Sequence, residues 1–212
     1  MSIYIQRILG VLDKLEQVHV SDSLDKVTPK NSSRFHEAIA EVYDDLDGQG
    51  DWKQIAPRAF DIELRNHAII LDTDIDFNRY RTKTLRCEIY DKNGLNAEAL
   101  RRFNRTYEKE CLKIASHGEN WTSNFAEQHF GKSNDNGELG GSGSAQWKYI
   151  AFKNYLTDLT SLTQKGYNYH RISIYETLMI NEKLTPLKTL LMSNREDYTA
   201  YLEKYFRRVL SL

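Results

Sequence analysis

Residues 60–74 read FDIELRNHAIILDTD, which is two short apolar runs on either side of a polar turn. Apolar runs bounded by turn residues and acids are typical of an antiparallel hairpin. If Arg65 and Asn66 form the turn, the numbers of each cross-strand pair sum to 131. Asp61 then faces Ile70, and Asp72 is its diagonal neighbour.

Side chains alternate between the two faces of a strand, so this register sorts the hairpin into two faces. One face is expected to be core and the other acidic. The predicted core face holds Phe60, Ile62, Leu64, Ile69 and Leu71, and the predicted acidic face holds Asp61, Glu63, Asp72 and Asp74.

The acidic face is a candidate metal site. Diagonal partners in a hairpin lie roughly 7–8 Å apart, a separation at which two carboxylates can converge on one cation. Carboxylates gathered without a cation would raise one another's pKa. Oxygen ligands suit Mg or Mn rather than Zn, and such an ion can bind a phosphate and activate a water. The alternative is that these acids only keep the ends of the strands soluble.

Charge changes sign along the chain after the hairpin. Residues 41–76 hold ten acids and three bases, whereas residues 79–113 hold ten bases and five acids. A metal site beside a phosphate-binding surface requires such an arrangement. The alternative is that these are two solvated faces whose difference in charge arose by chance.

Within the basic segment, four cations follow the acids at mostly alternate positions: Arg79, Arg81, Lys83 and Arg86. They are candidates for contacts to the phosphates of DNA. The alternative is that they pair with the acidic cluster.

The periodicity of the rest of the chain indicates an α/β or α+β arrangement, and we expect an α/β fold in which helices flank the hairpin and one further strand. The predicted strand covers 170–175, and residues 117–145 lack a period and are expected to form a long functional or disordered loop. Helices are expected over 2–17, 33–46, 96–116, 146–162, 181–192 and 195–210.

Composition limits the class of protein. A chain of 212 residues suits a single domain over 1–212, with N-terminal helices in 1–50, a core over 55–175 and C-terminal helices over 181–212. No apolar run is long enough to span a membrane, and no signal-peptide pattern opens the chain. Cys87 and Cys111 form no CxxC pair, so we expect reduced thiols and a cytoplasmic protein.

The segment from Phe60 to Arg81 resembles the PD-(D/E)XK restriction-endonuclease-like superfamily, and is nearest to members of the very-short-patch-repair type. The resemblance covers about 25 residues and implies a restriction-endonuclease-like central sheet flanked by helices. It implies catalytic, metal-binding roles for Asp61, Asp72 and Asp74, with Asp72 in place of the usual glutamate. It also places the helix carrying Glu37 and Glu41 near the sheet, where either would be a candidate accessory acid.

Two residues of the superfamily pattern are missing. Asp74 occupies the position of its lysine, although this branch commonly lacks that lysine, and Asp76 occupies the position of a histidine expected shortly after the acids.

The leading hypothesis is therefore a Mg- or Mn-dependent endonuclease acting on DNA. The second is an inactive protein of the same fold that serves as a binding or interaction module, for example in a bacterial defence or toxin-immunity system. An unrelated α/β domain with an acidic hairpin is the third. A protein partner or homodimer is compatible with the aromatic and basic C-terminal helix.

Overall fold

The computed structural model describes residues 2–15, 33–64, 66–91, 97–115, 120–163, 168–193 and 195–212. The chain divides into two compact units. Unit 1 comprises residues 1–25, 60–72 and 166–212, and unit 2 comprises 26–59 and 73–165. This division does not test independent folding, so the single domain over 1–212 stays a prediction.

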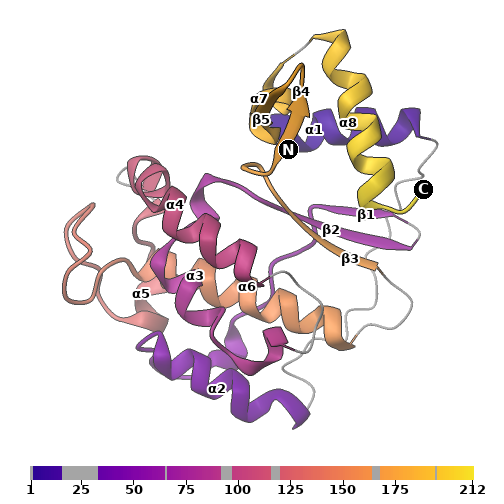
Figure 1. The fold of residues 1–212 in the computed structure, drawn as a ribbon. Helices are drawn as coiled ribbons and strands as arrows, with labels where there is room; N and C mark the ends of the chain where they lie inside the picture. Colours follow the sequence, from indigo (N-terminus) through magenta and orange to yellow (C-terminus); the bar gives the residue numbers. More distant parts are fainter. Residues whose placement is uncertain are drawn as a thin grey trace. The chain divides into compact units, whose positions relative to one another are not determined.

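Within the described residues, unit 1 contains a three-stranded sheet in the order β1-β2-β3 (Figure 1). Its strands are β1 (Ile62–Leu64), β2 (His67–Asp72) and β3 (Asn168–Ser173). β1 pairs antiparallel with β2, with Ile62 opposite Ile69, so the predicted register with pairs summing to 131 is confirmed. Asn66 lies in the turn, and Arg65 falls outside the described residues.

The predicted division of the hairpin into one core face and one acidic face is wrong. All six residues of β2 are buried, including Ala68 and Ile70, which alternate onto the same face of the strand as Asp72. β2 is the central strand, and its pairing with β3 is parallel. Strands in parallel pairs are commonly buried on both faces, which explains the apolar residues on the expected acidic side.

Helices from both ends of the chain complete the core of unit 1. Ser2 caps α1 (Ile3–Lys14), and its side chain accepts a hydrogen bond from the Ile5 N–H at 3.3 Å. The buried side of α1, which includes Ile8 and Leu12, follows the predicted helical spacing. α1 packs against α7 (Leu187–Met192) and α8 (Glu196–Val209).

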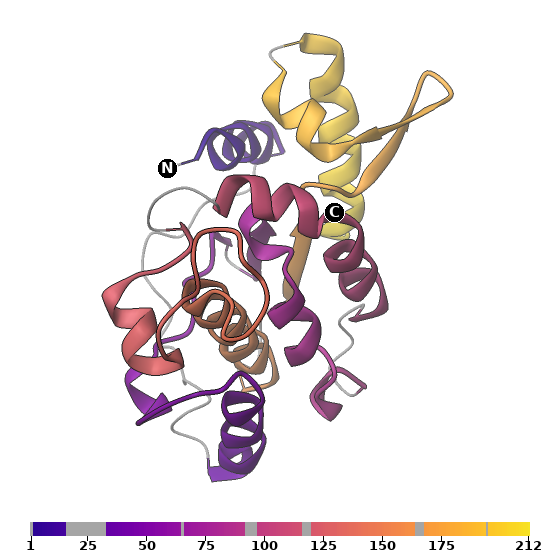
Figure 2. The same ribbon diagram turned by 90° about the vertical axis from the view of Figure 1, so that its left-hand side faces the viewer.

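The helix predicted over 181–192 is wrong in its first half. β4 (Thr177–Ile180) and β5 (Lys183–Pro186) form an antiparallel ribbon, which Figure 2 shows extending beside α7 and α8. Asn181 and Glu182 make the turn with positive φ angles of 46° and 63°. Two consecutive residues with positive φ form a two-residue hairpin turn whose twist matches that of the strands.

Unit 2 is helical and is organised around α6 (Ala145–Thr163), which packs against α3 (Arg79–Thr84) and α5 (Asn124–Phe130). Trp147, Phe152 and Leu156 of α6 are completely buried. The unit also contains α2 (His36–Asp45), α4 (Ala97–Ala115) and the short 3-10 helices η2 (Ser33–Phe35), η3 (Trp52–Gln54), η4 (Asp74–Asp76) and η5 (Glu88–Asp91).

The prediction of a long loop without regular structure over 117–145 is wrong in part, because α5 lies inside it. The glycine-rich segment after α5 is held by specific contacts. Trp121 is buried, and its indole N–H donates to the Asn134 carbonyl at 2.9 Å. Gly143 has a φ of 63°, and a Cβ there would overlap the Tyr80 hydroxyl, so glycine is required.

The protein therefore has a mixed α/β fold, as predicted. Across the described ranges, no helix combines the length and the apolar character needed to cross a membrane.

A pair of histidines joins β2 to β3. His67 Nδ1 and His170 Nε2 are 2.8 Å apart, and the two rings stack with centroids separated by 5.1 Å. Burial lowers the pKa of both imidazoles, and the proximity of His67 contributes to lowering that of His170 to about 4. Protonation of both rings would remove the acceptor of their hydrogen bond and place two positive charges side by side.

We expect this pair to make unit 1 sensitive to acid. Because the folded pKa of His170 lies below its unfolded value of about 6.5, the stabilisation is present above pH 6.5 and is lost as the pH falls toward 4. Urea unfolding across this range should show a smaller pH dependence in His170→Gln than in wild type, while His36→Gln in unit 2 leaves it unchanged. An NMR-titrated His170 pKa above 6 would contradict this account.

Candidate functional site

Asp61 immediately precedes β1, and Asp72 is the last residue of β2. The backbone N–H of Asp61 donates to the Ile69 carbonyl at 2.9 Å and extends the strand pairing by one residue. Its carboxylate Oδ2 accepts a hydrogen bond from the Leu71 N–H at 2.8 Å. One carboxylate of the predicted site is therefore tied to the neighbouring strand.

Asp72 has a buried partner that sequence reasoning missed. The Arg171 guanidinium, from β3, donates to Asp72 Oδ1 in an ion pair whose side chains are 1% and 4% exposed, respectively. Parallel pairing of β2 with β3 sets Asp72 opposite Ser173, two residues beyond Arg171. The alternation in residues 170–175 predicted the strand and contained this arginine, but 99 positions separate the partners.

Asp74 does not continue the strand. β2 ends at Asp72, and Asp74 begins the 3-10 helix η4, where it is half-buried. The prediction that strand alternation places Asp74 on the face of Asp61 and Asp72 is therefore wrong. Asp61 and Asp72 belong to unit 1, whereas Asp74 belongs to unit 2.

Asp76, which stands where a histidine was expected, is a buried structural acid of unit 2. Its Oδ2 accepts from the Thr73 N–H at 2.8 Å and completes a capping box at the start of η4. Its Oδ1 accepts from Arg58 at 3.0 Å and from Asn154 at 2.9 Å. The burial of Asp76 requires these donors, since an unpaired buried carboxylate is costly.

Among the residues that the structure describes, no three histidine, cysteine, aspartate or glutamate side chains are grouped so as to hold a metal ion. The metal-binding and catalytic roles of Asp61, Asp72 and Asp74 stay predictions.

The four predicted phosphate-binding cations have different surroundings in unit 2. Arg79 forms an ion pair with Glu108 at 2.9 Å, and Arg81 is buried against Asp158. Lys83 donates to the Asp45 carbonyl at 3.2 Å, and Arg86 is exposed. The segment is therefore not one continuous basic surface, and its first two cations pair with acids of α4 and α6 rather than with the hairpin.

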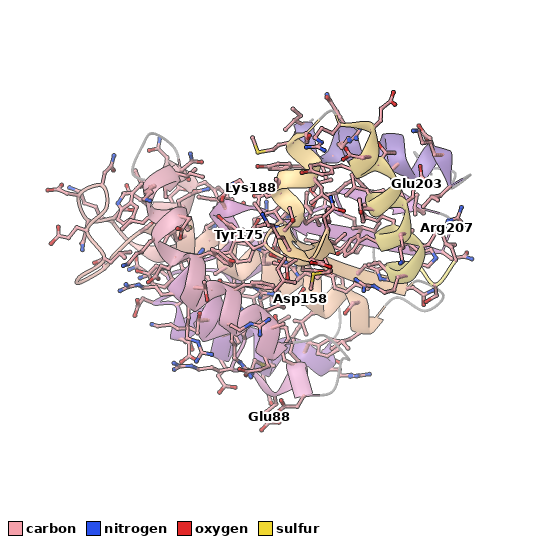
Figure 3. The ribbon with its side chains drawn as sticks, turned by 45° about the horizontal axis from the view of Figure 1, so that its top comes forward. Glu88, Asp158, Tyr175, Lys188, Glu203 and Arg207 are labelled. Carbon is pink, nitrogen blue, oxygen red and sulfur yellow. The ribbon has the colours of Figure 1, made fainter. Side chains whose placement is uncertain are left out.

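Arg81 is the centre of a buried polar network. Its guanidinium lies 2.5 Å from Asp158 Oδ2 and 3.0 Å from the Tyr90 hydroxyl, which itself donates to Asp158 at 2.6 Å. Asp158 lies on α6 (Figure 3) and is completely buried. The pKa of Tyr90 is raised, mainly by desolvation. The Tyr90 hydroxyl therefore stays neutral and donates a hydrogen bond to Asp158. These contacts hold α3 and η5 against α6.

A cavity of about 500 Å³ lies within unit 2. Residues of η2 and α2, the α3–η5 segment and the end of α6 line it. Lys83 and Arg86 are among them, as is Glu41, one of the two candidate accessory acids. Glu37 is exposed on the first turn of α2, and both acids belong to unit 2.

Comparison with known proteins relates the chain to a family without an assigned activity. The model of DUF7255, described as a family of unknown function, matches residues 41–193. No curated protein and no solved structure matches the chain. The matched range includes the hairpin, the Arg81 network and most of the residues around the cavity.

We expect the Arg81–Asp158 pair to contribute far more to stability than the exposed Arg79–Glu108 pair. Asp158→Ala leaves a buried guanidinium without its carboxylate and should lower the free energy of unfolding by about 3–5 kcal/mol. Arg79→Ala removes a surface pair and should cost about 0–1 kcal/mol. Urea denaturation of both variants measures the difference, and equal losses would contradict the assignment.

Proposed function

The chain belongs to DUF7255, a family of unknown function, and from the chemistry of its own residues we propose that it is a binding module that does not hydrolyse phosphodiester bonds. This is the second of the hypotheses drawn from the sequence. The observation that carries it is the buried ion pair between Asp72 and Arg171.

The surroundings of Asp72 fit a catalytic metal poorly. A catalytic Mg ion is bound through one or two carboxylates and needs further room for its waters and for a substrate phosphate. The Asp72 side chain is 4% exposed and already has a positive counter-charge from the chain itself. Asp61 directs one carboxylate oxygen to a backbone N–H. Arg171 thus supplies the positive charge that the sequence pattern assigned to a metal ion.

The same pair explains why Asp72 is tolerated in a buried strand. A carboxylate removed from water needs an opposite charge and hydrogen-bond donors close by. Arg171 provides both for Asp72 from the adjacent strand. In this interpretation the ion pair stabilises the alignment of β2 with β3, which is a structural role.

A metal-dependent endonuclease is the second candidate. Its support is that Asp61 immediately precedes β1 and that Asp72 ends β2, so that one acid borders each of the two paired strands. For this candidate, a cation would have to compete with Arg171 for Asp72.

A plasmid-nicking assay with Mg or Mn distinguishes the two candidates. We expect wild-type protein to leave supercoiled DNA intact at any metal concentration that does not itself cleave DNA. Isothermal titration with Mn should show no saturable binding that depends on Asp61 or Asp72.

The test variant is Asp61→Ala, and Glu63→Ala is its matched control. Both substitutions remove a half-buried acid, Glu63 within β1 and Asp61 immediately before it. Mn-dependent nicking that Asp61→Ala abolishes and Glu63→Ala retains would overturn the binding-module proposal and establish the endonuclease. Circular dichroism of each variant checks that it is folded.

A further inference from the structure

We infer that the cavity of unit 2 binds a small phosphate monoester that carries hydroxyl groups. This inference rests on the proposed function and deepens it, because it names a ligand class for a module that binds without hydrolysis. The cavity volume of about 500 Å³ lies within the range of about 300–1,000 Å³ that small-molecule sites occupy.

The inner wall of the cavity is apolar. Phe35, Val42 and Ile89 line it and are themselves at most 9% exposed, so they belong to the core and shape the cavity floor. Small-molecule sites commonly combine such a floor with a few polar groups that orient the ligand.

Cationic side chains surround this floor: Arg34, Lys83 and Arg86. Within the described part of the chain, neither the Arg34 nor the Arg86 guanidinium has a hydrogen-bond or ion-pair partner, whereas the guanidinium groups of Arg79 and Arg81 are both paired with carboxylates. The Arg34 guanidinium lies 4.9 Å from the centre of the Phe35 ring, which holds it at the cavity edge. Two arginines without carboxylate partners among these residues suit a phosphate, which accepts paired hydrogen bonds from guanidinium groups.

Carboxylates share the same rim. Glu41 and Asp45 are one helical turn apart on α2, and Glu88, labelled in Figure 3, follows α3. These acids would repel a continuous polyanion such as a nucleic-acid backbone. They accept hydrogen bonds from hydroxyl groups, so the mixed rim favours one compact anionic group on a hydroxylated body.

The Lys83 ammonium is a cation of the rim that also contacts α2, the helix that carries Glu41 and Asp45. It donates to the carbonyl of Asp45 at the end of α2, and its charge has no carboxylate in that contact. It therefore adds to the positive potential of the two arginines and remains close to the acceptors of α2. The ligand would place its phosphate toward the arginines and its hydroxyl groups toward Glu41 and Asp45.

Calorimetric titration of the full chain tests the inference with four probes: inorganic phosphate, ribose 5-phosphate, adenosine 5′-monophosphate and unphosphorylated ribose. We expect at least one organic phosphate to bind at least tenfold more tightly than inorganic phosphate and ribose. The two organic probes distinguish a sugar phosphate from a nucleotide.

Arg86→Ala should weaken binding of that probe at least tenfold. Arg79→Ala is the matched control, since it removes a cation of the same segment that does not line the cavity, and binding should be unchanged. Equal weakening in both variants, or no binding of either organic phosphate, would overturn the inference.

Thiol alkylation gives a second measurement on the unmodified protein. Cys87 lines the cavity and is half-buried, whereas Cys111 is completely buried. A bound organic phosphate should slow the alkylation of Cys87, and an unchanged rate at saturating ligand would place the ligand elsewhere. The two proposals can fail separately. DNA nicking together with organic-phosphate binding in the cavity would contradict only the non-hydrolytic function. Absence of both DNA nicking and organic-phosphate binding would contradict only the ligand inference.

Discussion

The parallel pairing of β2 with β3 is the constraint on which the rest of this structure depends. Parallel neighbours cannot be joined by a tight turn, so the chain must make a long crossover between them. Here the crossover includes residues 73–165 of unit 2 and contains the whole of α3 to α6. Most of unit 2 is thus an insertion between two adjacent strands of unit 1.

That pairing also decides the chemistry of the acidic hairpin. A β2 paired on one side only could have presented Asp61 and Asp72 to solvent. With β3 alongside, β2 is buried throughout, and Asp72 requires a partner inside the protein. Arg171 occupies the strand position from which it reaches Asp72. One backbone arrangement therefore accounts both for the tolerance of a buried acid and for its reduced suitability as a metal ligand.

Cationic side chains have two different roles in this protein. Buried cations such as Arg81 and Arg171 are neutralised by acids and stabilise packing between elements. The exposed arginines at the cavity of unit 2 have no such partner among the described residues. The difference between paired and unpaired cations, rather than the net charge of a segment, is what distinguishes structural positions from the candidate binding site.

Short-range patterns in the sequence determined the elements whose signals are local. The helices over Ile3–Lys14, Ala97–Ala115 and Ala145–Thr163 follow from apolar spacing, and the hairpin register follows from the turn position and side-chain alternation. The ribbon of β4 and β5 was missed because its strands have only four residues each, and a short apolar run fits a helix or a strand equally well.

Only the tertiary structure decided which charges meet. Asp72 with Arg171 and Arg81 with Asp158 are pairs separated by 99 and 77 positions, and no local spacing relates such partners. The cavity likewise draws on segments that lie far apart in the chain. The sequence alone therefore determined that residues 62–64 and 67–72 pair as a hairpin, and the packing of distant strands and helices decided what surrounds the acids near it.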